Sequence, residues 1–284
     1  MPLALGSQTA GSLTRPAAYC GGAGFVAPVG GPLSTEGFAG LSHSLDAVGL
    51  LTPTVADLRL VYGILTAGTT PPVVTHPPVR PRLAVWTGTE LGDVAPDMLA
   101  ALARSAQHLA VDLGAEFVEI DWPVRTPRLA DAHLTVMAYE AARTLAEEGS
   151  RPDLLSAPLN ALLARGRGTT SAEYRHALSV AEGARTDMLA LLTEVDAVLG
   201  PAAPGAAPRG LDATGSPVLS RPWQLFGLPV VTVPGHRDDS GLPLGLQLVG
   251  HPERPEALFA LGHAIEVAAR TARGNACRAS NKHT

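Results

Sequence analysis

The segment over residues 82–120 most constrains the fold, because it has the pattern of two short strands joined by one helix. Residues 82–86 and 117–120 are mostly apolar segments of strand length. Between them, residues 95–113 place apolar side chains on one helical face and stop before Gly114. Two strands joined by a single helix lie parallel in one sheet, with a right-handed connection. The sequence therefore predicts an α/β fold.

Further strands and helices extend this pattern in both directions. Apolar runs predict strands over residues 2–6, 196–199, 230–233 and 244–249, the last two paired as a hairpin across a polar turn. Periodicity predicts helices over residues 12–20, 55–67, 128–148, 153–165, 170–193 and 255–270. Capping boxes at Thr54/Asp57 and Thr170/Glu173 support two of these helix starts. Residues 21–53 and the Pro-rich segment 69–82 are predicted to be a long loop and a linker. We expect one α/β domain over residues 1–270 and a disordered tail over 271–284.

Composition excludes several classes of function. A net charge of -5 without a basic block gives no electrostatic footprint for nucleic acid. Cys20 and Cys277 lie too far apart for a zinc motif, and the histidines show no metal-ligand spacing. The chain has no signal-peptide pattern and no apolar run of about 18 residues. We therefore expect a cytoplasmic protein without a metal or cofactor, which binds neither membrane nor nucleic acid.

The N-terminal segment has the order of elements that suits a nucleophile. An apolar strand runs into a turn of small polar residues, Ser12 follows, and a helix begins. Backbone N–H groups in such a turn point outward and can stabilise developing negative charge. Taken alone, a serine in this position is more often a simple helix cap.

Several longer motifs resemble those of the amidase signature family. The resemblance is carried, in family order, by GSQTAGSLTRPAAYCG at residues 6–21, GF at 24–25, STEG at 34–37, SLDAVG at 44–49, DAVLGP at 196–201, RPWQLFGLP at 221–229 and GLPLGLQLVG at 241–250. Residues 70–190 match only in the order of their elements. The chain is thus similar to the family over residues 2–270.

This resemblance implies an α/β fold with a mixed β-sheet flanked by helices. It also implies an enzyme that acts on C–N bonds of carboxamides through a Ser–cis-Ser–Lys triad. It implies that Ser12 is the acyl nucleophile. The amides of Thr9, Ala10 and Gly11 would then form the oxyanion hole, where small residues allow close approach of the substrate.

Other positions receive supporting roles from the same resemblance. Ser44 and Asp46 would order the loops beside the site. Arg15 matches an arginine that follows the nucleophile, with a structural ion pair as the alternative. Trp223 and Phe226 would line the substrate pocket, with core packing as the alternative.

The proton acceptor of the triad has no match in this chain. The 21 basic residues include a single lysine, Lys282, which lies in the expected tail. The cis-Ser and the lysine of the family lie upstream of the segment that resembles residues 2–6. His43, between Ser42 and Ser44, is the nearest substitute in sequence. A serine without a base is a poor nucleophile, so we expect a fold incomplete at its N-terminus and a chain that is inactive alone.

Three functions stay open. The first is an amidase-type serine hydrolase completed by an N-terminal fragment, which acts on a small-molecule amide. The second is a non-catalytic remnant or binding module with the same fold. The third is an amidotransferase A-type subunit. Because an incomplete fold exposes a sheet edge and apolar helix faces, we also expect poor solubility or homo-oligomerisation.

Overall fold

A computed structural model describes residues 2–67, 77–120 and 125–280 of the chain. Within these residues, eight strands form one mixed sheet in the order β1-β3-β2-β7-β8-β6-β4-β5. The strands are β1 (Ala4–Gln8), β2 (Ala23–Val26), β3 (Ala47–Thr52), β4 (Arg82–Val85), β5 (Glu116–Glu119), β6 (Ala197–Pro201), β7 (Val230–Arg237) and β8 (Pro243–Val249). β4 pairs in parallel with β5 and β6, and the other pairs are antiparallel. The predicted α/β class with a mixed sheet is confirmed.

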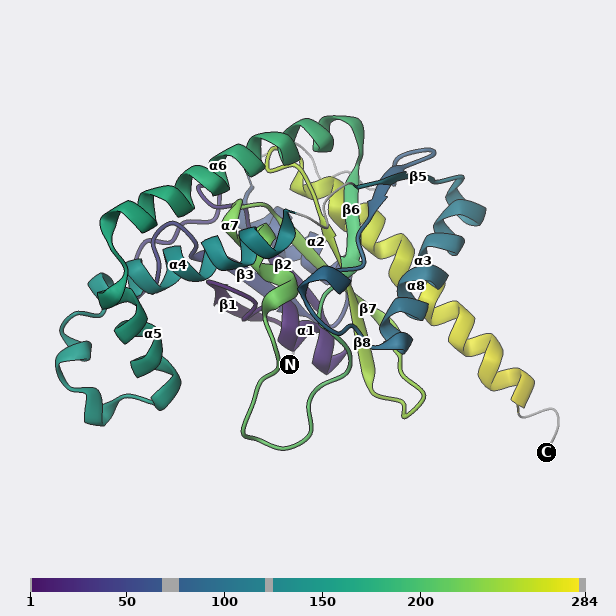
Figure 1. Cartoon of the computed structure of the whole chain (residues 1–284). Coiled ribbons are helices and arrows are strands. Elements are labelled where there is room, and N and C mark those ends of the chain that lie inside the picture. Colours follow the sequence, from purple (N-terminus) through teal and green to yellow (C-terminus); the bar gives the residue numbers. More distant parts are fainter. Residues whose placement is uncertain (1, 68–76, 121–124, 281–284) are drawn as a thin grey trace.

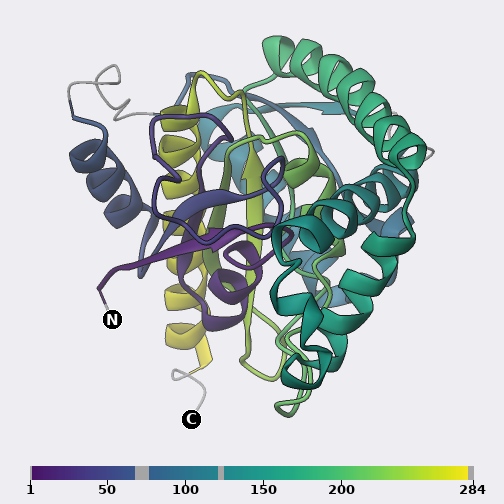
Figure 2. The same cartoon turned by 90° about the vertical axis from the view of Figure 1, so that its left-hand side faces the viewer.

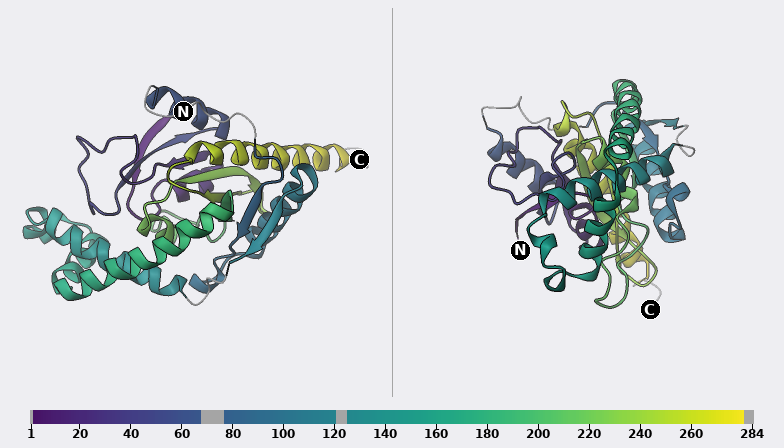
Figure 3. Two further views of the ribbon diagram at one scale, coloured as in Figure 1. Left: turned by 90° about the horizontal axis from the view of Figure 1, so that it is seen from above. Right: turned by 60° about the vertical axis from the view of Figure 1, so that its left-hand side comes forward.

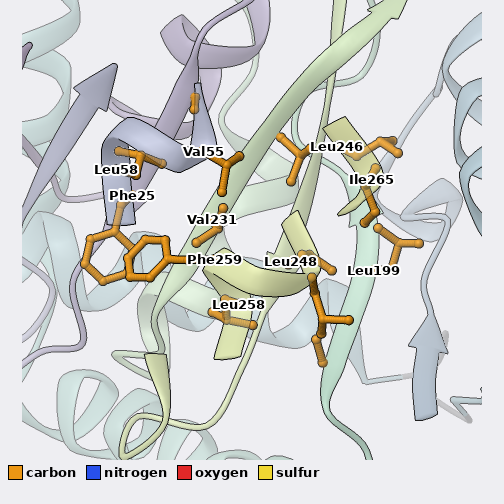
Figure 4. Packing of buried hydrophobic residues seen from close by; sticks show 14 of the residues in the cluster. Phe25, Val55, Leu58, Leu199, Val231, Leu246, Leu248, Leu258, Phe259 and Ile265 are labelled. Atoms are coloured by element: carbon orange, nitrogen blue, oxygen red, sulfur yellow. The ribbon is translucent and has the colours of Figure 1, made fainter. Parts of the chain in front are cut away.

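Helices cover both faces of this sheet (Figures 1 and 3). They are α1 (Thr14–Cys20), α2 (Val55–Leu65), α3 (Pro96–Leu113), α4 (Thr126–Thr144), α5 (Ala157–Gly168), α6 (Ser171–Glu194), α7 (Arg221–Leu225) and α8 (Pro255–Ser280). Side chains from α2, α3 and α8 pack on one face, around Phe25, Phe259 and Leu248 (Figure 4). Side chains from α4, α6 and α7 pack on the opposite face, around Val136 and Trp223. The sheet therefore lies between two layers of helices.

Most of the predicted helices and strands are present, but their first and last residues differ from the predicted ones. The parallel β4–β5 pair joined by α3 and the β7–β8 hairpin are confirmed. The capping box at Thr170 and Glu173 is confirmed, and Thr54 caps α2 by accepting a hydrogen bond from the N–H of Asp57. α8 continues to Ser280 and so runs through much of the segment expected to be a tail. The predicted linker falls in part on residues 69–76, outside the described residues.

The prediction of a loop over residues 21–53 is wrong, because this segment contains β2 and β3. β2 is only four residues long and pairs with β3 and with the distant β7. β3 carries Gly49, where an added Cβ would overlap the Phe25 carbonyl of the neighbouring strand. Gly49 therefore looks like a loop signal in the sequence but is needed for close strand packing.

One side of the molecule exposes apolar side chains. β1 is an edge strand, and its Leu5 is 69% exposed. On α2, Leu60 and Ile64 are 63% and 65% exposed. Figure 2 shows α2 on the outer side of the molecule, near the N-terminus. This surface agrees with the expected exposed edge and apolar helix face.

Among the helices of the described residues, none combines the length and the apolar character of a membrane span.

Candidate active site

The candidate site is the turn of residues 9–12, which we call the nucleophile turn. It joins β1, which ends at Gln8, to α1, which begins at Thr14. Ser12 is exposed, and none of the described residues makes a hydrogen bond to its hydroxyl. Within the same described part of the chain, the N–H groups of Ala10 and Gly11 have no backbone acceptor. The turn thus presents one free hydroxyl and free amides side by side.

The side chain of Gln8 fixes the end of the turn against α1. Its Oε1 accepts hydrogen bonds from the N–H groups of Leu13 and Thr14, at 2.9 and 3.0 Å. These are N–H groups at the start of a helix, which otherwise lack partners. Gln224 of α7 holds Gln8 in turn, by accepting from its Nε2 at 2.9 Å and donating to its carbonyl at 3.1 Å. Leu45 O also accepts from Gln224.

Thr9 is held on two sides. Its hydroxyl donates to Asp46 Oδ1 at 2.5 Å, and its carbonyl oxygen lies 2.8 Å from Nε2 of His133 on α4. The other oxygen of Asp46 accepts from the N–H groups of Leu41 and Ser42, at 2.7 and 2.9 Å. Asp46 therefore connects the nucleophile turn to the loop before β3.

Glu140, two turns after His133 on α4, holds that loop in place. Its carboxylate accepts from the hydroxyls of Ser42 and Ser44 at 2.6 Å each and from the Ser44 N–H at 3.0 Å. The hydroxyl of Tyr174 on α6 donates to it at 2.7 Å. Glu140 is 1% exposed, so these contacts replace the water that a buried carboxylate loses.

Arg15 supports the far side of the turn. Its Nε donates to the Gly11 carbonyl at 3.2 Å, and its guanidinium donates to the carbonyls of Thr214 and Gly215. Burial lowers the pKa of Arg15, although Tyr19 nearby acts in the opposite direction. At Gly11 itself, an added Cβ would lie 3.0 Å from Pro217. The close approach of the loop that Arg15 binds therefore favours a small residue at position 11.

Ser12 opens on a cavity of about 510 Å³. Its walls come from α1 and from the loop after β6, and they are lined by Ser12, Arg15, Pro16, Tyr19, Cys20, Ala207, Pro208, Gly210, Leu211, Ala213 and Thr214. Most of this lining is apolar or small, with one guanidinium at the edge. A cavity of this size accommodates a small organic molecule.

Burial sets the protonation of the two titratable groups behind the turn. Burial lowers the pKa of His133 to about 4, while its hydrogen bond to Thr9 acts in the opposite direction. The imidazole is therefore neutral near pH 7. Burial raises the pKa of the Glu140 carboxyl, but the hydrogen bonds that it accepts outweigh this, and the net pKa lies below its ordinary value of 4.5. Glu140 is therefore ionised.

The structure brings most of the predicted site residues together. Thr9, Ala10, Gly11 and Ser12 form the turn, and Asp46 and Arg15 contact it directly. Ser44 is connected to the turn indirectly, through Glu140, Ser42 and Asp46.

The remaining predicted residues lie elsewhere. Trp223 and Phe226 are each 1% exposed, and neither lines the Ser12 cavity. The indole of Trp223 packs edge-on against Trp86, as core packing requires. His43 Nε2 lies 3.3 Å from Glu140. Lys282 is outside the described residues.

Sequence reasoning missed His133, Glu140 and the Gln8–Gln224 pair. One signal was available for the first two. They lie seven residues apart on a helix, which places them on the same face, and that face also carries Leu129 and Val136. Polar residues on an apolar helix face are buried, and buried polar groups need specific partners.

Comparisons with known proteins give the family. The sequence model of the family described as Amidase matches residues 1–259. The A subunit of glutamyl-tRNA(Gln) amidotransferase from Thermosynechococcus vestitus is 29% identical over 93% of this chain and 63% of its own length. The crystal structure of an amidase superposes with a TM-score of 0.82 and 29% identity, covering 93% of this chain and 62% of that one. The structure of a vestigial protein complex, described as revealing the evolutionary origins of an s-triazine catabolic enzyme, gives a TM-score of 0.80 at 25% identity, covering 94% of this chain and 63% of that one.

The chain spans less than two thirds of the length of these relatives. The family match nevertheless covers the nucleophile turn, the sheet and all helices up to the first turn of α8. The chain belongs to the amidase signature family.

Proposed function

We propose that this chain is the serine-bearing part of an amidase-type hydrolase that cleaves carboxamide C–N bonds. The observation that carries the proposal is the nucleophile turn, where the exposed Ser12 hydroxyl lies next to unpaired backbone amides and opens on a cavity. An acyl-transfer site needs these two features within about 3 Å of one reacting carbonyl.

The reaction follows from these groups. Ser12 Oγ attacks the amide carbonyl and loses its proton, and the N–H groups of Thr9, Ala10 and Gly11 bind the resulting oxyanion. The tetrahedral intermediate collapses when the amine leaves with a proton, which gives an acyl-Ser12 ester. Water then attacks the ester and releases the carboxylic acid and free Ser12.

The first proton needs an acceptor. Among the described residues, none is hydrogen-bonded to the Ser12 hydroxyl. His133 does not serve, because its side chain is 0% exposed and its one described hydrogen bond goes to the Thr9 carbonyl and not to Ser12. We therefore propose that a lysine and a bridging serine come from a polypeptide segment outside residues 1–284, which completes the site.

Acylation with p-nitrophenyl acetate tests the nucleophile. Its good leaving group tolerates a weakly activated serine, and raising the pH compensates for a missing base. We expect an acetyl group on the Ser12 peptide in mass spectra, at a rate that rises with pH. The adduct should disappear in Ser12→Ala and persist in Ser150→Ala, which removes an exposed serine elsewhere. An equal distribution of label over exposed serines would refute the assignment of Ser12.

The coding DNA before Met1 tests the completing segment. An in-frame Gly/Ser-rich stretch with a lysine upstream of it supports our proposal, and coexpression of that stretch should restore turnover of a simple amide. Stop codons in all frames favour the alternative of a non-catalytic remnant.

A second candidate function rests on the relatives. Several curated relatives are named as the A subunit of glutamyl-tRNA(Gln) amidotransferase, which favours a component that releases ammonia within a larger complex. Copurification with other subunits and glutamine-dependent ammonia release would favour this candidate over a free-standing amidase.

A further inference from the structure

His133 is a buried histidine whose only described hydrogen bond is to the nucleophile turn. It is 0% exposed, and its Nε2 lies 2.8 Å from the carbonyl oxygen of Thr9. A carbonyl oxygen only accepts hydrogen bonds, so Nε2 carries the hydrogen and His133 is the donor. Within the described part of the chain, Nδ1 has no hydrogen-bond partner. A buried imidazole with a single contact points to a specific task at that contact.

The contact fixes the direction of the next amide in the turn. No cis peptide bond occurs among the described residues, so the peptide between Thr9 and Ala10 is trans. In a trans peptide the C=O and the following N–H point in opposite directions. Because His133 pulls the Thr9 carbonyl toward α4, the N–H of Ala10 points away from α4.

We propose that His133 is a positioning residue that aims the Ala10 N–H at the oxyanion formed on Ser12. This inference rests on the proposed function, since it needs an acyl-transfer reaction at Ser12. On this inference, the direction of an oxyanion-hole amide is set by a side chain on α4, which lies more than 100 residues from the turn in sequence.

A second contact makes the arrangement rigid. The Thr9 hydroxyl donates to Asp46 at 2.5 Å, so the residue is held through its side chain as well as through its carbonyl. Asp46 is 7% exposed and is itself held by two backbone amides. If the Thr9–Ala10 peptide rotated, the hydrogen bond to His133 would be lost. The Thr9 side chain would still be bound to Asp46, so the rotation would not free the residue. An oxyanion hole that is fixed in advance needs no reorganisation during the reaction.

His133 is also suited to this task by its charge. Burial holds its pKa at about 4, so the donor is a neutral imidazole across the pH range in which serine hydrolysis is measured. The positioning contact is therefore independent of pH near neutrality. A histidine that acted as the base would instead titrate in the rate profile.

Two amide substitutions test the inference. In His133→Gln, the side-chain amide takes the place of Nε2 and can donate to Thr9, whereas in His133→Asn it is too short and lies near the place of Nδ1. We expect His133→Asn to lower the maximal rate of Ser12 acylation by p-nitrophenyl acetate about 10- to 100-fold. The ester concentration at half-maximal rate should stay the same, and His133→Gln should keep the rate within about threefold.

The controls separate positioning from folding and from the reaction itself. His108→Asn on α3, outside the site, should leave the rate unchanged, and thermal melts report the folded fraction of each variant. Imidazole ¹⁵N spectra of the wild-type chain should show the Nε2–H tautomer of His133 between pH 5 and 8. If that tautomer is absent, the inference is overturned whatever the kinetics.

The possible kinetic outcomes are distinct. Equal losses of acylation rate in the Gln and Asn variants, or no loss in either, overturn the inference. If the wild type is still acylated at Ser12, the proposed function is unaffected by that result. A wild-type chain that is never acylated at Ser12 overturns both. A step in the pH–rate profile that disappears in the Gln variant would make His133 a base and overturn the positioning role.

Discussion

Replacement of Glu140 should destabilise the fold more than the loss of any exposed carboxylate. Glu140 joins three elements, because it accepts from the loop before β3, lies on α4 and binds Tyr174 of α6. In Glu140→Ala, four donors lose their acceptor. The Ser42 side chain is fully buried, so its hydroxyl has no access to water, whereas Ser44 and Tyr174 are partly exposed.

The magnitude follows from these differences in burial. A buried donor left without an acceptor costs about 1–3 kcal/mol, and hydrogen bonds to a charged group lie at the upper end of their range. Counting the Ser42 hydroxyl in full and the three donors of Ser44 and Tyr174 in part gives about 3 to 5 kcal/mol for Glu140→Ala. Glu140→Gln keeps the shape and one acceptor oxygen, so about 1 to 2 kcal/mol is expected.

Urea unfolding followed by circular dichroism measures this loss. The control is Glu147→Gln, for which we expect less than about 0.5 kcal/mol because the Glu147 side chain is 88% exposed. Because the folded pKa of Glu140 lies below 4.5, its contribution is present above that pH and is lost as the pH falls through the folded pKa. Glu140→Gln should therefore flatten the decline of stability on the acid side. A loss in Glu140→Ala no larger than in the control would refute the reasoning.

Three further predictions concern other parts of the fold. The folded pKa of His133 is about 4, against 6.5 for the unfolded chain. Between these two pH values the unfolded state binds more protons, so the free energy of unfolding falls as the pH is lowered, by about 3 kcal/mol in all. His133→Gln should remove this slope in urea titrations at pH 7, 5.5 and 4.5, and an unchanged slope would contradict the assignment. The double substitution Leu60→Gln and Ile64→Gln on the outer face of α2 should increase the monomer fraction in size-exclusion chromatography without lowering the melting temperature, whereas a lower melting temperature would place this face in the core. Gly166→Ala should lower the free energy of unfolding by about 2 kcal/mol or more, because its Cβ would overlap the backbone of α4. Gly168→Ala has open space around it and should lower that free energy little. Equal losses in the two variants would contradict this close helix crossing.

Local signals predicted the elements whose partners are close in sequence. The β4–α3–β5 unit, the β7–β8 hairpin and the Thr170 capping box each depend on residues within one short segment, and all three are confirmed. β2 and β3 depend on pairing across the chain, since β2 contacts β7 about 200 residues later. Pairing at such a distance leaves no periodic pattern in four residues, and the glycines required for close packing look like loop residues.

The site divides in the same way. The resemblance to the family predicts the roles of Thr9 to Ser12, because these residues are contiguous and form one motif. Its support was not predicted, because His133 and Glu140 lie in the segment that resembles the family only in the order of its elements. α4 brings His133 to Thr9 of the turn and Glu140 to Ser42 of the neighbouring loop, and only the fold makes these contacts.

The distribution of contacts around the turn explains how an exposed serine can keep a defined geometry. The carbonyls of Thr9 and Gly11 are held by His133 and Arg15, while Gln8 caps the helix that follows. Each of these contacts uses a backbone atom of residues 9–13, and none uses the Ser12 hydroxyl. The turn therefore does not depend on a proton acceptor for its shape. If a further segment supplies the base, as we propose, it would bind beside a turn whose geometry is already fixed. The free energy of its binding would then not be reduced by the cost of ordering Ser12.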